Sequence, residues 1–486
     1  MLPINADWIK KELGILYGSR VVKEINAINK LYEIYDGPGQ DWEIAAGLEY
    51  EPNKTITNLV KTLIKEEARF MASRAPEITF VPEESKDDDK CKALNVFLRD
   101  ILSASKWQSK LIKATRDCFI GKRVAMKLTG GRGSPLKVSF RPSQEFVFET
   151  ADDDVDTLSK IIFFYQIMGF EDDGQKDKQR IWVQKYEMVN GRCLLSQGLF
   201  DGFGKDVGDN NFTGRDIGLD FIPCCVIIND GLTGDLFGES DVETLIGNQT
   251  TYNRTNSDDV DALRFNLFPM TYTVDASPES TDAMTIAPGA YADIASGSSG
   301  PGANQAKLGI LESQFSYNDR IENRLNRTKN DMYGALSIPN VSLEQLKGLA
   351  QSGKGMKALY WPLISRCEEK WAEGWDDALT WMVESLVKMA KAYNVTQLPE
   401  INYSISVEHQ YPLPEDKESE QITDMSEVQH KVRSRKKYIE KHQPKTDADG
   451  ELRQIAAEQN LFDNDFYGMQ PPSRTPRDPP DEPEEA

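Results

Sequence analysis

The sequence predicts an α+β protein that is mainly helical and carries a block of antiparallel strands in its first half. Apolar residues recur at helical spacing over several long stretches, and short alternating or β-branched segments fill residues 121–229. A third observation is the apolar pattern from Met356 to Tyr393, in which every step is one, three or four residues. This pattern predicts a helix about 55 Å long, because an α-helix rises ~1.5 Å per residue.

Length and composition indicate a multidomain globular chain. It has 486 residues, and domains of roughly 100 to 200 residues predict about three structural units. The apolar fraction of 39% and the charged fraction of 28% are close to globular averages, so most of the chain is expected to fold. The net charge of −21 argues against a free nucleic-acid-binding protein, whose surface is normally basic. It does not exclude a protein that surrounds DNA without gripping it.

Signals for membranes, disulfides and metals are absent from the sequence pattern. The stretch MLPINADWIKKELG lacks the pattern of a signal peptide, and the longest apolar run is far shorter than the ~18 residues that cross a bilayer. We expect a soluble protein made in a cytoplasm. Six scattered cysteines without a C-x-x-C pair and three histidines predict neither a disulfide framework nor a zinc site. The acidic turn at 152–156 lacks the order of a calcium loop, so no metal or cofactor is expected.

The first third of the chain predicts helices. Apolar spacing favours one or two helices over residues 5–35, which the breaker DGPGQ ends. The same pattern predicts a helix from Asn53 to Ala72, and the following SRAPEITFVPEE is extended. Another helix is expected from Cys91 through Phe119. The antiparallel region then occupies residues 121–229.

The middle of the chain predicts two polar helices around a small β-rich excursion. Residues 239–266 form a long helix with a thin apolar stripe, and residues 316–336 form a second polar helix. A polar helix of this kind cannot be an ordinary core helix, so we expect it to pack against copies of itself. The β-rich excursion between the two carries a Gly/Ser-rich tip at 296–302.

The stretch GLAQSGKGMK, residues 348–357, comes within one residue of a phosphate-binding loop. Gly348, Gly353 and Lys354 fall in place, but Gly355 stands where the pattern requires Ser or Thr for magnesium. The preceding SLEQLKGLA looks helical or irregular, and no later acidic strand end is visible. The chain also lacks G-x-S-x-G and H-E-x-x-H motifs. We therefore predict no catalytic residue, and a protein that is not an enzyme.

The order of the elements and four segments resemble the portal proteins of tailed bacteriophages, in particular the SPP1 type. The order is helix, small β lobe, helix, Gly-rich loop and very long helix, and the resemblance covers roughly residues 20 to 415. The segments are NLVKTLIKEEARFMASRAPEITF, ESDVETLIGNQTTYNRTNSDDVDAL, NLFPMTYTVD and SGKGMKALYWPLISRCEEKW. None is specific alone, but their order and spacing together make the match.

The resemblance implies a portal fold and a dodecameric ring at one capsid vertex. Double-stranded DNA would enter through the axial channel during packaging and leave through it during ejection. The fold divides the chain into a wing at 1–238, a first stem helix at 239–266, a clip at 267–311, a second stem helix at 312–336, a tunnel loop at 337–355, a long wing helix and strand at 356–415 and a crown at 416–465. The Pro-rich acidic tail at 466–486 is expected to be disordered.

The resemblance also implies partners and a location. The ring would be a docking platform for the terminase large subunit and the head–tail adaptor protein, and it would contact the major capsid and scaffolding proteins. It would lie at the portal vertex of the virion after assembly in the host cytoplasm, without membrane contact. Two alternatives stay open: a P-loop ATPase of a packaging motor, and another ring-forming head–tail adaptor without a DNA channel.

Residues near the tunnel loop are the first site candidates. Lysine ammonium groups there would touch DNA phosphates without reading sequence, although they could also only hydrate the start of the long helix. These candidates are Lys347, Lys354 and Lys357. The glycines of the same stretch predict a hinge between a channel-lining segment and a rigid helix. They are Gly348, Gly353 and Gly355.

The second stem helix carries three arginines at spacings of four and three, Arg320, Arg324 and Arg327. This spacing places them on one helix face. They could contact DNA in the channel, pair with carboxylates of a neighbouring subunit, or pair within the helix with Asp319, Glu322 or Asp331. The overall acidity also has two interpretations: it lets DNA slide through a channel, or it only keeps a large assembly soluble.

Overall fold

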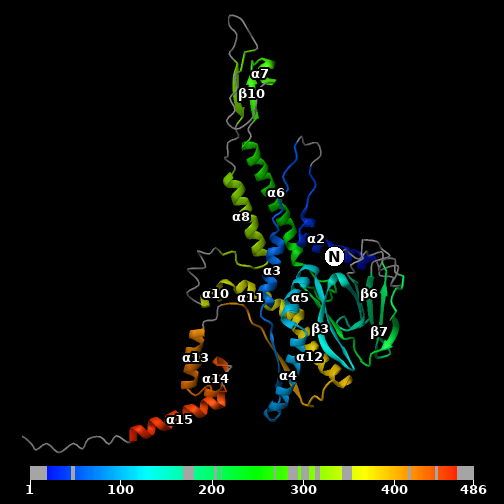
Figure 1. Ribbon diagram of the computed structural model, residues 1–486, viewed down its shortest axis with the longest axis vertical. Helices are drawn as coiled ribbons and strands as arrows, with labels where there is room; N and C mark the ends of the chain where they lie inside the picture. Colours follow the sequence, from blue (N-terminus) through cyan, green and yellow to red (C-terminus); the bar gives the residue numbers. More distant parts are fainter. Residues whose placement is uncertain are drawn as a thin grey trace, which may run out of the picture. The chain divides into compact units, whose positions relative to one another are not determined.

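Figure 1 shows the computed structural model, which describes residues 19–44, 50–167, 180–201, 205–209, 211–267, 270–282, 294–296, 306–311, 318–341, 353–413, 417–443 and 447–467. The chain forms two compact units. The larger comprises residues 1–346 and 358–412, and the smaller comprises residues 347–357 and 413–486. The boundary between them falls within helix α10 (Gly353–Leu359). The predicted α+β class is confirmed.

The larger unit begins with helices. They are α2 (Ser19–Asp36), α3 (Leu59–Ala72), α4 (Asp88–Ala104) and α5 (Trp107–Gly121). The predicted breaker after the first helix is confirmed as a short 3-10 turn, Pro38–Gln40. Strand β1 (Glu77–Pro82) follows α3 and pairs antiparallel with β12 (Tyr403–Glu408), so an early and a late segment of the unit meet in one small sheet. Residues 5–18 of the predicted N-terminal helices lie outside the described residues.

Residues 123–228 form the antiparallel region that alternation predicts, as two sheets. The three-stranded sheet has the order β3–β2–β9, and the five-stranded sheet runs from β4 to β8 in sequence order. The strands are β2 (Arg123–Gly131), β3 (Ser134–Pro142), β4 (Phe146–Thr150), β5 (Leu158–Ile167), β6 (Arg180–Val189), β7 (Arg192–Phe200), β8 (Phe212–Asp216) and β9 (Cys224–Ile228).

Helices cover these sheets and bury their apolar faces. Ile25 of α2 packs into one apolar cluster with residues of β4, β5 and β6, namely Val147, Ile162, Phe164, Ile181 and Val183. Helix α5 packs on β2 and β3, and α12 (Asp376–Ala392) packs on β2 and β9. Trp371 and Trp375 belong to the core, because both are buried and meet edge to face at 5.8 Å between ring centroids.

The middle of the chain contains two long helices that pack as a pair. Helices α6 (Asp241–Leu267) and α8 (Asn318–Ala335) pack side by side, and hairpin β10 (Met270–Val274) and β11 (Lys307–Leu311) lies between them in sequence (Figure 1). A short helix, α7 (Pro278–Asp282), follows β10. Gly309 of β11 lies under the ring of Tyr272, where an added Cβ would come within 2.3 Å of Cζ. Residues 297–302 of the predicted Gly/Ser-rich tip are outside the described residues.

Two predicted helices have different bounds in the structure. The helix predicted from Asn53 begins only at Leu59, because residues 53–58 are extended and Asn58 caps the helix by accepting from the Lys61 N–H. The single helix predicted from Cys91 to Phe119 is two helices. Lys106 takes a left-handed conformation with φ of 55°, which ends α4 and redirects the chain into α5.

The predicted 38-residue helix is also interrupted. Helix α10 ends at Leu359, Tyr360 forms a turn, and α11 (Trp361–Lys370) starts anew with Pro362 in its first turn. Proline has no N–H to donate and its ring clashes with the carbonyl four residues earlier, so the helix ends before it. A π turn, Trp371–Trp375, joins α11 to α12, and residues 361–392 run on as one helical segment about 48 Å long.

The smaller unit is helical in its C-terminal part, as predicted for residues 416–465. It contains α13 (Lys417–Gln429), α14 (Arg435–His442) and α15 (Ala448–Tyr467). Asp424 of α13 is buried and accepts from Arg433 at 2.7 Å, Lys441 at 2.8 Å and His442 at 2.7 Å. The Lys441 ammonium, with His442 and Arg433, holds the pKa of the Asp424 carboxyl below its usual value. Residues 468–486 of the predicted tail lie outside the described residues.

Candidate functional site

Helix α6 carries a buried ladder of polar side chains, one at every fourth residue. They are Gln249, Asn253, Ser257 and Asp261. Their partners are backbone N–H groups of the extended segment before α3, taken at every second residue. Asn53 N–H donates to Asp261 at 2.9 Å, Thr55 N–H to Ser257 at 2.9 Å, Thr57 N–H to Asn253 at 3.1 Å and Leu59 N–H to Gln249 at 3.1 Å.

The side chains of the ladder stay in register with the backbone N–H groups because the helical repeat and the extended repeat have nearly the same length. Four residues of α-helix rise about 6 Å, and two residues of extended chain span about 6.6 Å. One face of α6 therefore replaces the neighbouring strand that this segment would otherwise need for its N–H groups. The prediction that the polarity of residues 239–266 serves packing against copies of the helix is wrong for this face, because its partner is the same chain.

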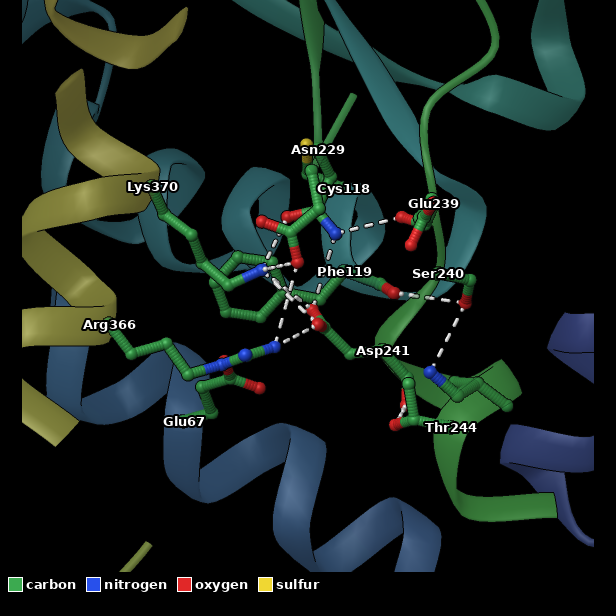
Figure 2. A network of polar contacts seen from close by, with 12 residues as sticks. Glu67, Cys118, Phe119, Asn229, Glu239, Ser240, Asp241, Thr244, Arg366 and Lys370 are labelled. Carbon is green, nitrogen blue, oxygen red and sulfur yellow. Dashed lines mark hydrogen bonds and ion pairs between the residues drawn. The ribbon is translucent and has the colours of Figure 1, made fainter. Parts of the chain in front are cut away.

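A buried network of charges lies at the first turn of α6 (Figure 2). Lys370 of α11 is buried, and its ammonium donates to Asp241 at 3.1 Å, to Asp230 at 3.0 Å and to the side-chain carbonyl of Asn229 at 2.8 Å. The Asn229 amide in turn donates to the Glu239 carbonyl at 2.9 Å. The network thus holds the connection from β9 to α6 against α11.

Arg366 extends this network to α3. Its Nε donates to Glu67 Oε1 at 2.8 Å, and its Nη2 donates to Asp241 and lies 3.6 Å from Asp230. Figure 2 shows Arg366 and Lys370 reaching from α11 toward Asp241. Elements from three distant parts of the sequence are therefore tied at one point, the base of α6. We call the five side chains Glu67, Asp230, Asp241, Arg366 and Lys370 the junction network.

The junction network brings three carboxylates together with only two cations. Burial, and after it the charge of Asp241, raises the pKa of Glu67 to about 7, although Lys370 and Arg366 oppose the shift. Burial alone would lower the pKa of Lys370, but Asp241, Glu67 and Asp230 together raise it above its ordinary value. The network is therefore an arrangement of mutually dependent charges rather than a catalytic pair.

Two members of the junction network stand out in the sequence as charged residues at core positions of helical patterns. Glu67 follows Leu63 and Ile64 on the apolar stripe of α3, and Lys370 lies between Cys367 and Trp371 on that of α11. A charge at a core position of a helical pattern requires a buried partner. Which partner it finds is not visible in the sequence, since Lys370 and Asp241 are separated by 129 residues.

The three stem arginines are exposed in the structure. Arg320, Arg324 and Arg327 lie on one face of α8, whereas Thr328 and Met332 are buried on another. Within the described parts of the chain, no carboxylate pairs with any of the three guanidinium groups, so the intrahelical pairs with Asp319, Glu322 and Asp331 are not formed. We call these three residues the arginine row.

The tunnel-loop candidates are only partly described. Lys347 and Gly348 lie outside the described residues, and Lys357 is exposed in the last turn of α10. Gly353, Lys354 and Gly355 belong to α10 rather than to the loop predicted at 337–355, because the helix begins at Gly353 instead of Met356. The arginine row and Lys357 belong to different units.

No cluster of His, Cys, Asp or Glu in the described ranges is arranged to hold a metal ion. Among the helices that the structure describes, none has the length and apolar character required to cross a membrane.

Comparison with protein families finds a match over most of the chain. The model of the family described as phage portal protein, SPP1 Gp6-like, matches residues 20–461. The match begins in α2, ends in α15 and includes both the junction network and the arginine row. No curated protein matches the chain significantly.

Proposed function

Because the chain belongs to the SPP1 Gp6-like family of phage portal proteins, we propose that it forms a dodecameric ring at one capsid vertex. Portal proteins are components of the virion that take part in DNA packaging, and the family is not one of enzymes. The match over residues 20–461 carries the proposal, since it spans the whole order of elements from α2 to α15. The alternative of a P-loop ATPase is therefore set aside.

In this proposal the ring encloses a channel through which double-stranded DNA enters during packaging and leaves during ejection. Residues 1–238 with 356–415 form the wing, α6 and α8 the stem, 267–311 the clip and 416–465 the crown. The pairing of α6 with α8, with the β10–β11 hairpin between them in sequence, supports this division. A ring of identical subunits joins them by contacts that close on rotation.

The arginine row is the best-supported contact of the stem. Three exposed guanidinium groups without a carboxylate partner in the described residues are available to phosphates or to a neighbouring subunit. The chain as a whole, with its net charge of −21, does not hold DNA by counterion release, which favours sliding. Contact with DNA would be to phosphates and independent of sequence.

Residues 337–352 are proposed as the tunnel loop, and the glycines at its junction with α10 are proposed as its hinge. Replacing Lys347 and Lys354 with Ala is expected to leave ring assembly intact and to change DNA packaging or retention. Unchanged packaging in this double variant would demote both lysines to ordinary surface residues. The hinge role of Gly348, Gly353 and Gly355 remains part of the same proposal.

Docking partners follow from the position of a portal ring in the particle. The proposed clip would bind the terminase large subunit during packaging and the head–tail adaptor protein afterwards, and the wing would contact the major capsid and scaffolding proteins. The ring would be assembled in the host cytoplasm and retained in the virion. A ring-forming adaptor without a DNA channel is the second candidate, because the exposed arginine row could serve subunit contacts alone.

Capsid assembly with and without this chain tests the proposed function. Capsids that contain the chain, mixed with the cognate terminase and ATP, should fill with DNA that resists nuclease. Capsids assembled without it should protect none. Filling that does not depend on the chain would contradict the proposal. If capsids that lack the chain still fill with DNA, and only the later attachment of the tail fails, the head–tail adaptor would be favoured instead.

A further inference from the structure

Glu67 is fully buried, and only one of its two carboxyl oxygens has a hydrogen-bond partner among the described residues. We propose that the Glu67 carboxyl is a proton-operated latch. It binds a proton while the junction of α3, α6 and α11 is closed and releases that proton when the junction opens, so the junction loosens as pH rises toward neutrality. The inference concerns the folded chain itself and does not depend on the proposed function.

The charges around Glu67 support this assignment. It is faced by Asp241 from α6 and by Arg366 and Lys370 from α11, and both of these cations also pair with Asp230 from the segment between β9 and α6. The thiols of Cys367 and Cys118 lie close to the same network, and burial keeps the pKa of both well above the ordinary thiol value. With Glu67 neutral, two carboxylates balance two cations. With Glu67 ionised, the buried network carries one surplus negative charge.

Hydrogen bonding points the same way. Oε1 of Glu67 accepts from Arg366 at 2.8 Å, whereas Oε2 is buried and has no hydrogen-bond partner among the described residues. A buried ionised carboxylate needs both oxygens solvated or bonded, and leaving one bare is costly. For a neutral carboxylic acid, the free-energy cost of a buried oxygen without a hydrogen bond is much smaller. The geometry therefore favours the protonated form of Glu67.

Because of the position of Glu67, its protonation affects how tightly the start of α6 is held. Asp241 is the first residue of α6, and the polar ladder starts two turns further along the same helix. A charge gained by Glu67 repels Asp241 directly, and its attraction to Arg366 and Lys370 offsets only part of this repulsion and of the cost of burying the charge. Asp230 is 32% exposed and Arg366 is 22% exposed, so water reaches the edge of the network and protons can exchange.

The expected pH window follows from the sign of the shift. Burial raises the pKa of Glu67 from 4.5 to about 7, so the folded state holds a proton that the opened state releases. The equilibrium constant for opening the junction is therefore lowest below about pH 4.5. It increases by up to tenfold per pH unit as pH rises toward about 7, and it does not increase further above that pH.

Infrared spectroscopy of the full chain with carbon-13 in the glutamate carboxyls tests the proton directly. A protonated glutamate band is expected at about pH 6 and should be lost at about pH 8. It should be weaker by one carboxyl in Glu67→Gln and unchanged in Glu33→Gln, an exposed carboxylate of α2 that serves as control. Wild-type protein without such a band at about pH 6 would overturn the proposal, whether or not the variant folds.

Amide exchange in the first turns of α6 tests whether the proton on Glu67 controls opening of the junction. After correction for intrinsic rates, opening of residues 241–249 in wild-type protein should increase between about pH 5 and pH 7, whereas Glu67→Gln should show no such increase. Asp241→Asn removes a group that raises the pKa of Glu67, so it should move the infrared transition to lower pH. Equal pH dependence of exchange in wild type and Glu67→Gln would refute the latch.

Discussion

At the scale of single residues, Lys370 shows how strongly a buried charge depends on its partners. Its ammonium contacts Asn229, Asp230 and Asp241 and is almost fully buried. Removing one partner of such a pair leaves the other charge buried and uncompensated, which costs about 3–5 kcal/mol. The stability of the junction therefore resides in the pairing rather than in any one contact.

Lys370→Met should accordingly lower the midpoint of thermal unfolding strongly. The double variant Lys370→Met with Asp241→Asn should recover part of the loss, because it removes the stranded carboxylate. Lys391→Met, at an exposed position near the end of α12, is the matched control and should change stability by less than about 0.5 kcal/mol. A double variant no more stable than Lys370→Met alone would contradict this account of the network.

Lys127 gives a second residue-scale prediction, this time with pH. It is buried between the sheets, its ammonium lies 4.7 Å from the ring centroid of Phe163, and burial lowers its pKa to about 8. The unfolded state therefore binds a proton more readily, and wild-type stability should rise with pH between about 8 and 10.5. Lys127→Met should raise the unfolding midpoint below pH ~8, with a gain that shrinks at higher pH. A gain that is the same at all pH values would show that the charge is not its cause.

Sequence reasoning at this scale identified the arginine row but missed the junction network. Spacings of three and four showed that Arg320, Arg324 and Arg327 share a helix face, and the structure finds all three exposed there. Glu67 and Lys370 occupy core positions of their patterns, and only tertiary contacts over more than a hundred residues of chain reveal why a charge is tolerated.

At the scale of elements, the polar ladder makes α6 the partner of an extended segment rather than of a core. Asn253 is fully buried and accepts from Thr57 N–H, and its own amide donates to Gln40 at 3.1 Å. A non-polar residue at this position would leave a buried N–H without a partner, at a cost of about 1–3 kcal/mol.

Asn253→Leu should therefore lose amide-exchange protection at Thr57 and its neighbours and lower the unfolding midpoint. Asn326→Leu, at an exposed position of α8, makes the same chemical change without a buried partner and should have little effect. Protection of Thr57 that survives Asn253→Leu would mean that the ladder does not order this segment.

Element boundaries were the least predictable part of the fold. Periodicity predicted the type of nearly every described element, including the antiparallel region and both stem helices. It extended the helix before Leu59 back to Asn53 because nothing local shows that these N–H groups bond to α6. It also continued through Tyr360, although Pro362 in the next turn was a sufficient local reason for a break.

At the scale of the whole molecule, the arginine row separates an interaction with DNA from an interaction between subunits. Replacing Arg320, Arg324 and Arg327 with Ala removes exposed charges, so the fold should be unaffected. If the row faces DNA, rings should still assemble, and the salt dependence of packaging should become shallower, by a slope of about 0.9 for each phosphate that an arginine no longer neutralises. If the row joins subunits, rings should dissociate at lower salt than wild-type rings. Asn326→Ala on the same helix is the control.

The order of elements along the chain was the most informative whole-molecule signal. Helix, small β lobe, helix, Gly-rich loop and long helix indicated the portal family over residues 20 to 415, and the family model extends the match to residue 461. Ring size, channel and docking surfaces were predicted from the family resemblance alone, because they depend on copies of the chain and on partners that one sequence does not contain.

Electron microscopy of the purified full-length protein tests the central claim most directly. The portal assignment predicts closed rings with a central hole wide enough for a DNA duplex, and twelvefold symmetry in rings taken from capsids. The heterologous contacts must close on rotation for this to occur. Monomers, open filaments or rings without a continuous axial channel would contradict the claim.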